Sequence, residues 1–375
     1  MVFNMRYLDE RVWVILRELR PLIERQHIDI TKWQTKKKLF MRPEEADQDS
    51  MPWEAFDSST DRWYGKDVYY WFRAQFTVPQ SMDGKCIFLK IHTQIEEWDD
   101  GRNPQFLLFV DGKAVQGQDM NHREVRLTDC AEAGRTYTLD LQAYTGILHN
   151  EFALKVTADE TDLALLKLYY DLKAPADAYH YKRMPEGRTR SLLIEALNGA
   201  INKLDLRNPH SPEFDASVAE AQAYIDEHLY QNPELIGHDE IIASCIGHTH
   251  IDVAWWWTVS QTREKTARSF STVLKLMDEY PDYKFMSSQP QLYVFLKERY
   301  PEVYAKIKER VKEGRWIPEG GMWLEADCNL TSGESLVRQF LYGKKFFKDE
   351  FDIDSKILWL PDVFGYSGAL PQIMK

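Results

Sequence analysis

A polar cluster follows a short apolar run in the C-terminal third of the chain. Residues 247–252 read Gly-His-Thr-His-Ile-Asp, directly after the run Ile-Ile-Ala-Ser-Cys-Ile at 241–246. His250 and Asp252, two positions apart, can direct an imidazole and a carboxylate into one site, a donor set that suits Zn²⁺ and related divalent ions. His248 and His250 could also be ordinary loop histidines. The preceding strand and the nearby carboxylate favour a metal site.

Further carboxylates follow other predicted strands. Asp362 comes after the apolar run 356–360, and Glu325 and Asp327 come after the short run 315–318. Taken singly, each fits a turn or a helix cap equally well. In an α/β barrel, however, the carboxyl ends of the strands share one rim, where ligands and catalytic groups lie. We therefore expect these acidic groups to lie near Asp252.

Aromatic side chains are dense around these positions. Flat apolar rings beside polar groups suit the faces of sugars. Trp255, three residues beyond Asp252, is a candidate substrate-binding residue, whereas Trp256 and Trp257 fit core positions better. The other aromatic residues near these motifs are Trp323 and Phe364.

The elements that must position these residues differ along the chain. Residues 5–27 have apolar side chains at helical spacing, and short alternating runs punctuated by turns fill 30–155, as in an antiparallel β-sandwich. The Asp111-Gly112 pair predicts a hairpin turn. Residues 160–235 are helical in pattern. The predicted domains are an N-terminal helix and β-sandwich over 1–160, a helical connector over 161–237, and a catalytic α/β part over 238–375.

The last region alternates between strand and helix patterns, which predicts a parallel sheet. Four strands are too few to close an eight-stranded barrel, so we expect the first half of a parallel (β/α) barrel. The fold class is thus α/β plus all-β. The predicted strands are 241–246, 283–288, 315–318 and 356–360, and the predicted helices are 262–280, 291–312 and 333–350.

Composition limits the partners and the compartment. The 375 residues include 47 Lys and Arg against 59 Asp and Glu, a formal charge of −12, which argues against a nucleic-acid partner. No apolar run reaches the roughly 18 residues of a membrane span, and the charged N-terminus lacks the apolar core of a signal peptide. The four cysteines form no CxxC pair. These features predict a soluble cytoplasmic protein without a membrane partner.

Two motifs together resemble a known enzyme family. His-Thr-His-Ile-Asp-Val-Ala-Trp at 248–255 and Trp-Leu-Pro-Asp-Val-Phe-Gly-Tyr-Ser at 359–367 are similar to the α-mannosidases of glycoside hydrolase family 38, in their bacterial cytosolic branch. The resemblance implies zinc-dependent, retaining hydrolysis of terminal α-mannosyl linkages in oligosaccharides. It also implies roles for individual residues: His250 and Asp252 as Zn²⁺ ligands, Asp362 as nucleophile and third ligand, and Trp255 and Phe364 as walls of the mannose pocket.

One departure from the family pattern affects the expected activity. The family places a fourth ligand, a histidine, and the acid/base aspartate beyond the nucleophile, but no histidine follows His250 before Lys375. The expectation is therefore an N-terminal portion of a longer enzyme, or a shortened reading frame. Such a chain is expected to bind zinc weakly or not at all, and to be inactive alone.

Three alternatives stay open from the sequence. An amidohydrolase-type metal hydrolase also carries a His-x-His motif after its first barrel strand, but it would require further histidines at later strand ends. A non-catalytic fragment could bind carbohydrate or a partner through residues 30–160. The third alternative concerns assembly: a second copy of the chain is a candidate partner. The N-terminal helix either joins two copies or packs on its own domain.

Overall fold

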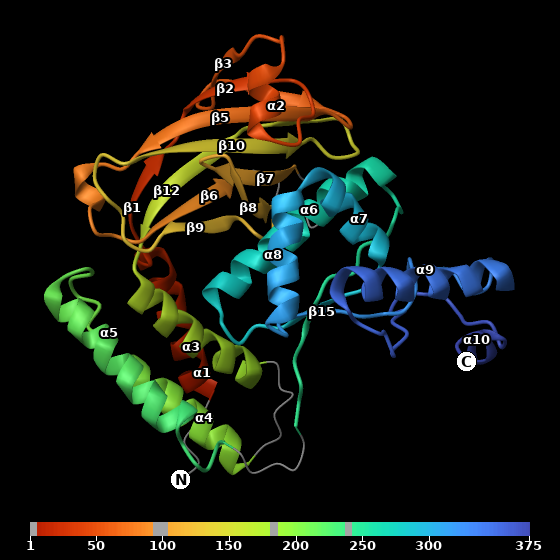
Figure 1. The fold of residues 1–375 in the computed structure, drawn as a ribbon. Coiled ribbons are helices and arrows are strands. Elements are labelled where there is room, and N and C mark those ends of the chain that lie inside the picture. Colours follow the sequence, from red (N-terminus) through yellow and green to blue (C-terminus); the bar gives the residue numbers. More distant parts are fainter. Residues whose placement is uncertain (1–5, 93–103, 181–186, 237–241) are drawn as a thin grey trace.

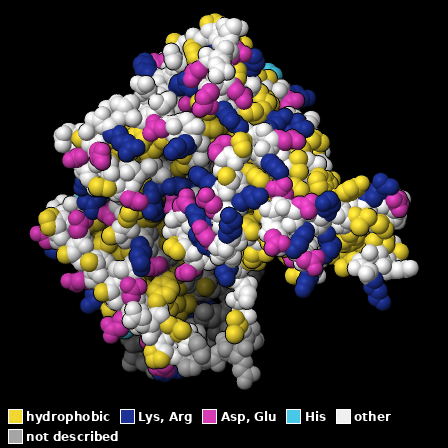
Figure 2. Space-filling view, viewed as in Figure 1, with side chains coloured by type: hydrophobic (Ala, Val, Ile, Leu, Met, Phe, Trp, Pro, Cys, Tyr) yellow, Lys and Arg dark blue, Asp and Glu magenta, His cyan; other side chains and the backbone are white. Residues whose placement is uncertain are grey.

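The computed structural model describes residues 6–92, 104–180, 187–236 and 242–375 (Figure 1). Its helices and strands form a β-sheet region, a helical region and a region of short parallel strands with helices. None of the described helices is both long enough and apolar enough to cross a membrane. On the face drawn in Figure 2, basic and acidic side chains intermingle instead of gathering by sign. The expected absence of a nucleic-acid partner stays a prediction.

Two antiparallel sheets face each other across one apolar core (Figure 1). Inward residues alternate along the strands, as at Ile87, Leu89 and Ile91, because successive side chains point to opposite faces. One sheet has the order β1 (Glu24–Asp29), β12 (Lys155–Thr161), β6 (Ile87–His92), β9 (Glu124–Thr128). The other has the order β3 (Glu54–Asp57), β2 (Lys32–Lys36), β5 (Tyr69–Thr77), β10 (Thr136–Tyr144), β7 (Gln105–Val110), β8 (Lys113–Gln118).

Smaller elements complete this region. The predicted hairpin turn joins β7 to β8, and both Asp111 and Gly112 have positive φ angles, of 49° and 80°. This conformation matches the twist of the flanking strands. The remaining elements are α2 (Pro43–Gln48), the two-stranded pair β4 (Trp63–Gly65) and β11 (Asn150–Phe152), and a 3₁₀ turn at Gln80–Met82.

The N-terminal helix packs with the helices that follow the sheets. This helix, α1 (Arg6–Leu19), shares an apolar core with α3 (Leu163–His180), α4 (Arg188–Ile201) and α5 (Pro212–Ile225). The predicted helix over 5–27 is too long: a 3₁₀ turn containing Pro21 follows Leu19, and β1 begins at Glu24. A π-helical turn, Asp226–Tyr230, extends α5. The predicted domain boundaries stay predictions.

Three short strands in the last region pair in parallel, in the order β13 (Gly247–His248), β14 (Phe285–Ser287), β15 (Trp316–Pro318). The predicted helix over 291–312 is two helices, because Tyr300 leaves the helical conformation ahead of Pro301. The helices are α6 (Val259–Glu279), α7 (Pro290–Arg299), α8 (Pro301–Lys312), α9 (Gly333–Phe351) and α10 (Leu370–Ile373).

Two predicted strands of this region differ from the structure. Residue 241 lies outside the described residues, and 242–246 form no strand and are exposed, with Ile242 88% accessible. The prediction of a buried strand there is wrong, because apolar composition does not supply a neighbour to cover it. In the predicted strand 356–360, Leu358 makes one isolated parallel bridge to Gly320. The described strands form an open sheet, and the half barrel stays a prediction.

The sheet region docks directly on the helix that follows the His-Ile-Asp motif. At Gly117 of β8, a Cβ atom would lie 2.5 Å from Cβ of Arg268 and 2.8 Å from its backbone, so only glycine permits this approach. The backbone N–H of Gly117 donates to Oγ1 of Thr272, 3.2 Å away. One turn earlier on α6, the buried carboxylate of Glu264 accepts hydrogen bonds from Oη of Tyr69 of β5 at 3.3 Å and from Nη1 of Arg299 of α7 at 3.1 Å. This seam between β8 and α6 holds the helix in place (Figure 1).

Candidate metal and active site

The loop after β13 is anchored by one apolar side chain between two polar ones. Ile251 is fully buried in the core around α6 and β14, whereas the side chains of His250 and Asp252 on either side of it are 28% and 35% exposed. The backbone carbonyl of Asp252 accepts hydrogen bonds from Nε1 of Trp257 at 3.2 Å and from Oγ1 of Thr262 at 3.3 Å. The loop is thereby tied to the start of α6.

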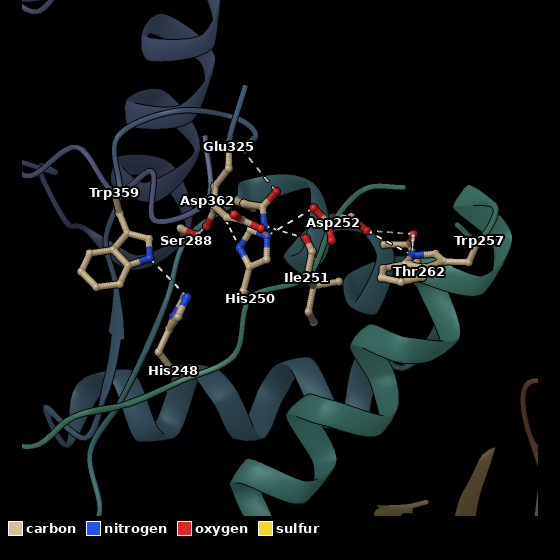
Figure 3. A network of polar contacts seen from close by, with 11 residues as sticks. His248, His250, Ile251, Asp252, Trp257, Thr262, Ser288, Glu325, Trp359 and Asp362 are labelled. Carbon is tan, nitrogen blue, oxygen red and sulfur yellow. Dashed lines mark hydrogen bonds and ion pairs between the residues drawn. The ribbon is translucent and has the colours of Figure 1, made fainter. Parts of the chain in front are cut away.

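Three residues singled out from the sequence converge (Figure 3). Nε2 of His250 lies 3.2 Å from Oδ1 of Asp252 and 3.6 Å from Oδ2 of Asp362. The three candidate ligand atoms all lie within 4.8 Å of one another. The Asp362 side chain is 58% exposed, so the cluster is open to solvent on the side of this carboxylate.

The other nitrogen of His250 faces a buried carboxylate. Nδ1 lies 2.8 Å from Oε2 of Glu325, whose side chain is only 5% exposed. Glu325, and to a lesser extent Asp252, raise the pKa of His250 to about 9, although burial of the ring opposes this shift. Three carboxylates around one imidazole form a site that favours positive charge, whether a proton or a metal ion.

His248 is engaged elsewhere. Nε1 of Trp359 donates to Nε2 of His248 at 3.2 Å, and Nδ1 of His248 lies 3.1 Å from the carbonyl oxygen of Met286. Because an indole N–H only donates, Nε2 of His248 must accept, and Nδ1 must carry the hydrogen shared with Met286. His248, His250 and Glu325 also form a compact group, but the Nε2 lone pair of His248 is already used. The amidohydrolase alternative therefore lacks its second histidine ligand.

The cluster of His250, Asp252 and Asp362 fits a divalent cation. One imidazole nitrogen and two carboxylate oxygens equal in number the three protein ligands of catalytic zinc sites, which leave a further position for substrate or water. His250 also has the carboxylate partner on its second nitrogen that metal-binding histidines commonly have.

Comparison with known proteins assigns the family. Residues 240–375 match the sequence profile described as "Glycosyl hydrolases family 38 N-terminal domain". Residues 240–375 therefore belong to glycosyl hydrolase family 38. Alpha-mannosidase G of Dictyostelium discoideum is 32% identical over 326 residues, covering 82% of this chain and 28% of that protein. Alpha-mannosidase 2C1 of Homo sapiens is 31% identical over 353 residues, covering 88% of this chain and 31% of that protein.

The matched domain and the two alignments cover different lengths of the chain. All of the cluster lies inside the matched family 38 domain, and the alignments with both relatives extend well beyond that domain. The chain spans about 30% of the length of these relatives.

A solved β-glucuronidase from Ruminococcus gnavus overlaps 37% of this chain and 29% of the glucuronidase chain, with 10% identity. The TM-score of 0.26 is too low to support any argument.

The two aromatic residues expected to line a sugar pocket are exposed in this family 38 domain. Trp255 is 67% accessible and Phe364 is 88% accessible. Trp256, which we expected in the core, is 72% accessible, and that expectation is wrong. The ring of Trp255 contacts those of its two neighbours, with centroids 5.3 Å from Trp256 and 6.0 Å from Trp257, and Trp256 is not among the buried residues of any apolar core. The substrate-binding roles of Trp255 and Phe364 stay predictions.

Two polar residues after β14 support the cluster and are not predicted from the sequence. Oγ of Ser288 donates to Oε1 of Glu325 at 2.6 Å. Nε2 of Gln289 donates to the carbonyl of Ile251 at 2.9 Å, and Oε1 of Gln289 accepts from the backbone N–H of Glu325 at 3.3 Å. Their only sequence signal is the polar pair Ser288-Gln289 directly after β14, and because this pair carries no carboxylate it does not indicate a metal ligand.

Proposed function

We propose that this chain carries the metal-holding residues and the nucleophile of a zinc-dependent, retaining α-mannosidase. Its substrates would be oligosaccharides with terminal α-mannosyl linkages. The observation that carries this proposal is the convergence of His250, Asp252 and Asp362 within the matched family 38 domain. Mannose is proposed as the sugar because both relatives are named alpha-mannosidases.

In this proposal Nε2 of His250 and the carboxylates of Asp252 and Asp362 would hold Zn²⁺. When bound, the ion supplies a Lewis acid for hydroxyl oxygens of the sugar. The chain's own residues prepare the site: the Ile251 side chain anchors the loop in the core, while hydrogen bonds from Trp257 and Thr262 hold the carbonyl of Asp252.

Asp362 is the proposed nucleophile, because its exposed carboxylate can meet a sugar from solvent. Its oxygen attacks the anomeric carbon as the bond to the leaving oxygen breaks, and a carboxylic acid about 5–5.5 Å away protonates that oxygen. Water, deprotonated by the same group, then hydrolyses the mannosyl ester and restores the Asp362 carboxylate. Two inversions leave the anomeric configuration retained. The exposed rings of Trp255 and Phe364 would pack on the sugar.

The test uses the complete product of the gene that encodes this chain. A purified protein is expected to hydrolyse 4-nitrophenyl α-mannoside, to lose activity on chelation and to regain it with Zn²⁺. A fluorinated mannosyl fluoride that forms a slowly hydrolysed ester should label the peptide containing Asp362, detected by mass spectrometry. Labelling at another residue, or an inverted first product in proton NMR, would overturn the assignment.

A further inference from the structure

Glu325 is a buried carboxylate with no role in the reaction described above. Its side chain is 5% exposed, and it lies in the loop after β15, on the far side of the His250 ring from Asp252 and Asp362 (Figure 3). Oε2 of Glu325 and Nδ1 of His250 are both shielded from solvent and lie 2.8 Å apart as an ion pair, and neither atom has another polar partner among the described residues. Each of these two atoms therefore depends on the other to offset the cost of its burial.

We propose that Glu325 is the positioning residue for His250 as a metal ligand. A histidine ring binds a metal through one nitrogen, and the partner of its other nitrogen fixes the tautomer and the ring orientation. With Nδ1 paired to the Glu325 carboxylate, Nε2 is the nitrogen that faces Asp252 and Asp362. This inference rests on the proposed metal site and adds a residue that the family motifs quoted above did not assign.

The geometry separates this role from direct ligation. Oε2 of Glu325 faces Nδ1, whereas the cluster forms around Nε2 of the same ring. The second oxygen, Oε1, accepts the hydrogen bond from Ser288. Direct ligation by Glu325 would break one of these contacts. The other compact group that contains Glu325 also includes His248, whose two ring nitrogens already face Trp359 and Met286.

Gln289 sets the spacing between Glu325 and His250. Its buried side chain bridges the carbonyl of Ile251, next to His250, and the backbone N–H of Glu325. Its backbone has a φ of 62°, a left-handed conformation that is uncommon for residues other than glycine. Ser288 and Gln289, at the end of the middle strand, thus connect the loops after the two outer strands.

The experiment measures metal affinity and metal coordination separately. The complete gene product, freed of metal, is titrated with Co²⁺, whose visible absorption reports the number and type of ligands. Glu325→Gln and Glu325→Ala are expected to bind Co²⁺ about 10–100-fold more weakly while keeping the absorption spectrum of the unsubstituted protein. Glu334→Gln on exposed α9 is the matched control, expected to change neither.

Each outcome separates this inference from the proposed function. Unchanged affinity in both Glu325 variants would overturn the positioning role, and a changed spectrum would make Glu325 a direct ligand and overturn it too. If Asp252→Ala loses Co²⁺ binding while the Glu325 variants give one of these two results, the positioning role is wrong but the proposed metal site stands. Absence of Co²⁺ binding in the unsubstituted protein would overturn both. Because Glu325→Gln preserves the shape of the side chain, it serves if Glu325→Ala does not fold.

Discussion

The indole nitrogen of Trp359 donates to Nε2 of His248 across 3.2 Å, and the two rings meet edge to face with centroids 5.1 Å apart. This contact joins the segment leading to Asp362 to the first parallel strand. It also removes His248 from the set of free metal ligands, although His248 stands only two positions from His250.

His248→Ala should therefore reduce stability more than metal binding. The change leaves the Trp359 N–H and the Met286 carbonyl without their partner, which should lower the free energy of unfolding by about 1–3 kcal/mol. Urea denaturation measures this loss. If the proposed metal site holds, Co²⁺ affinity of the complete gene product should fall less than about tenfold in His248→Ala, whereas His250→Ala should abolish binding. An equal loss in both variants would contradict our interpretation of His248.

Asp159→Asn should stabilise the protein at neutral pH. Burial raises the pKa of Asp159 to about 6, and its Oδ1 has no hydrogen-bond partner among the described residues. The folded state thus holds this proton more tightly than the unfolded state. The resulting stabilisation is present below about pH 4 and disappears as the pH rises through 6.

The asparagine should accordingly raise the free energy of unfolding by about 1–3 kcal/mol at pH 7.5, and by little at pH 4. Urea denaturation at the two pH values is the measurement. Asp282→Asn, in an exposed turn, is the control and should change stability at neither pH. A gain from Asp159→Asn of equal size at both pH values would show that proton binding is not its cause.

Gly117→Ala should weaken the seam between β8 and α6. The added methyl group would overlap Arg268, including its backbone, so one element must shift, at a cost of about 1–3 kcal/mol. Thermal unfolding measures the effect. Gly333→Ala, where a Cβ meets nothing within 4 Å, should instead stabilise by up to about 1 kcal/mol. Similar melting temperatures for the two variants would argue against a tight seam.

Gly365→Ala should impair the loop that carries Asp362. Gly365 has a φ of 125°, and a Cβ there would lie 2.5 Å from Nδ2 of Asn329, which donates to the carbonyl of Phe364. If the proposed function holds, kcat/KM for an aryl α-mannoside should fall at least about tenfold, since small displacements of reacting groups are costly. Gly368→Ala, with open space around its Cβ, should leave kcat/KM unchanged; a comparable fall there would remove the argument from Gly365.

Residue types and spacing predicted much of the candidate site. His250, Asp252 and Asp362 follow apolar segments whose ends meet at one edge, and the structure brings all three together. The supporting residues could not be found in this way. Ser288 and Gln289 act through hydrogen bonds to particular atoms of distant loops, and such pairings depend on tertiary distances that no local pattern encodes.

Local features of the fold could be predicted from the sequence, whereas burial and packing between distant segments could not. The Asp111-Gly112 turn and the helix beginning after Ser332 follow from local backbone preferences, and the structure has both. Burial of 242–246 was inferred from composition alone, yet burial depends on what packs against a segment. The packing of α1 on α3 to α5 likewise depends on contacts between residues more than a hundred positions apart.

The close approach of Gly117 to Arg268 bears on how this protein can be recombined. Many sheet regions join their neighbours through side chains, which can be redesigned at an interface without moving the main chain. Here the main chain of one element rests on the main chain of the other. A chimera that exchanges the sheets for those of a relative must therefore exchange α6 as well. β8 and α6 have to be replaced together, although they lie about 150 residues apart in the sequence.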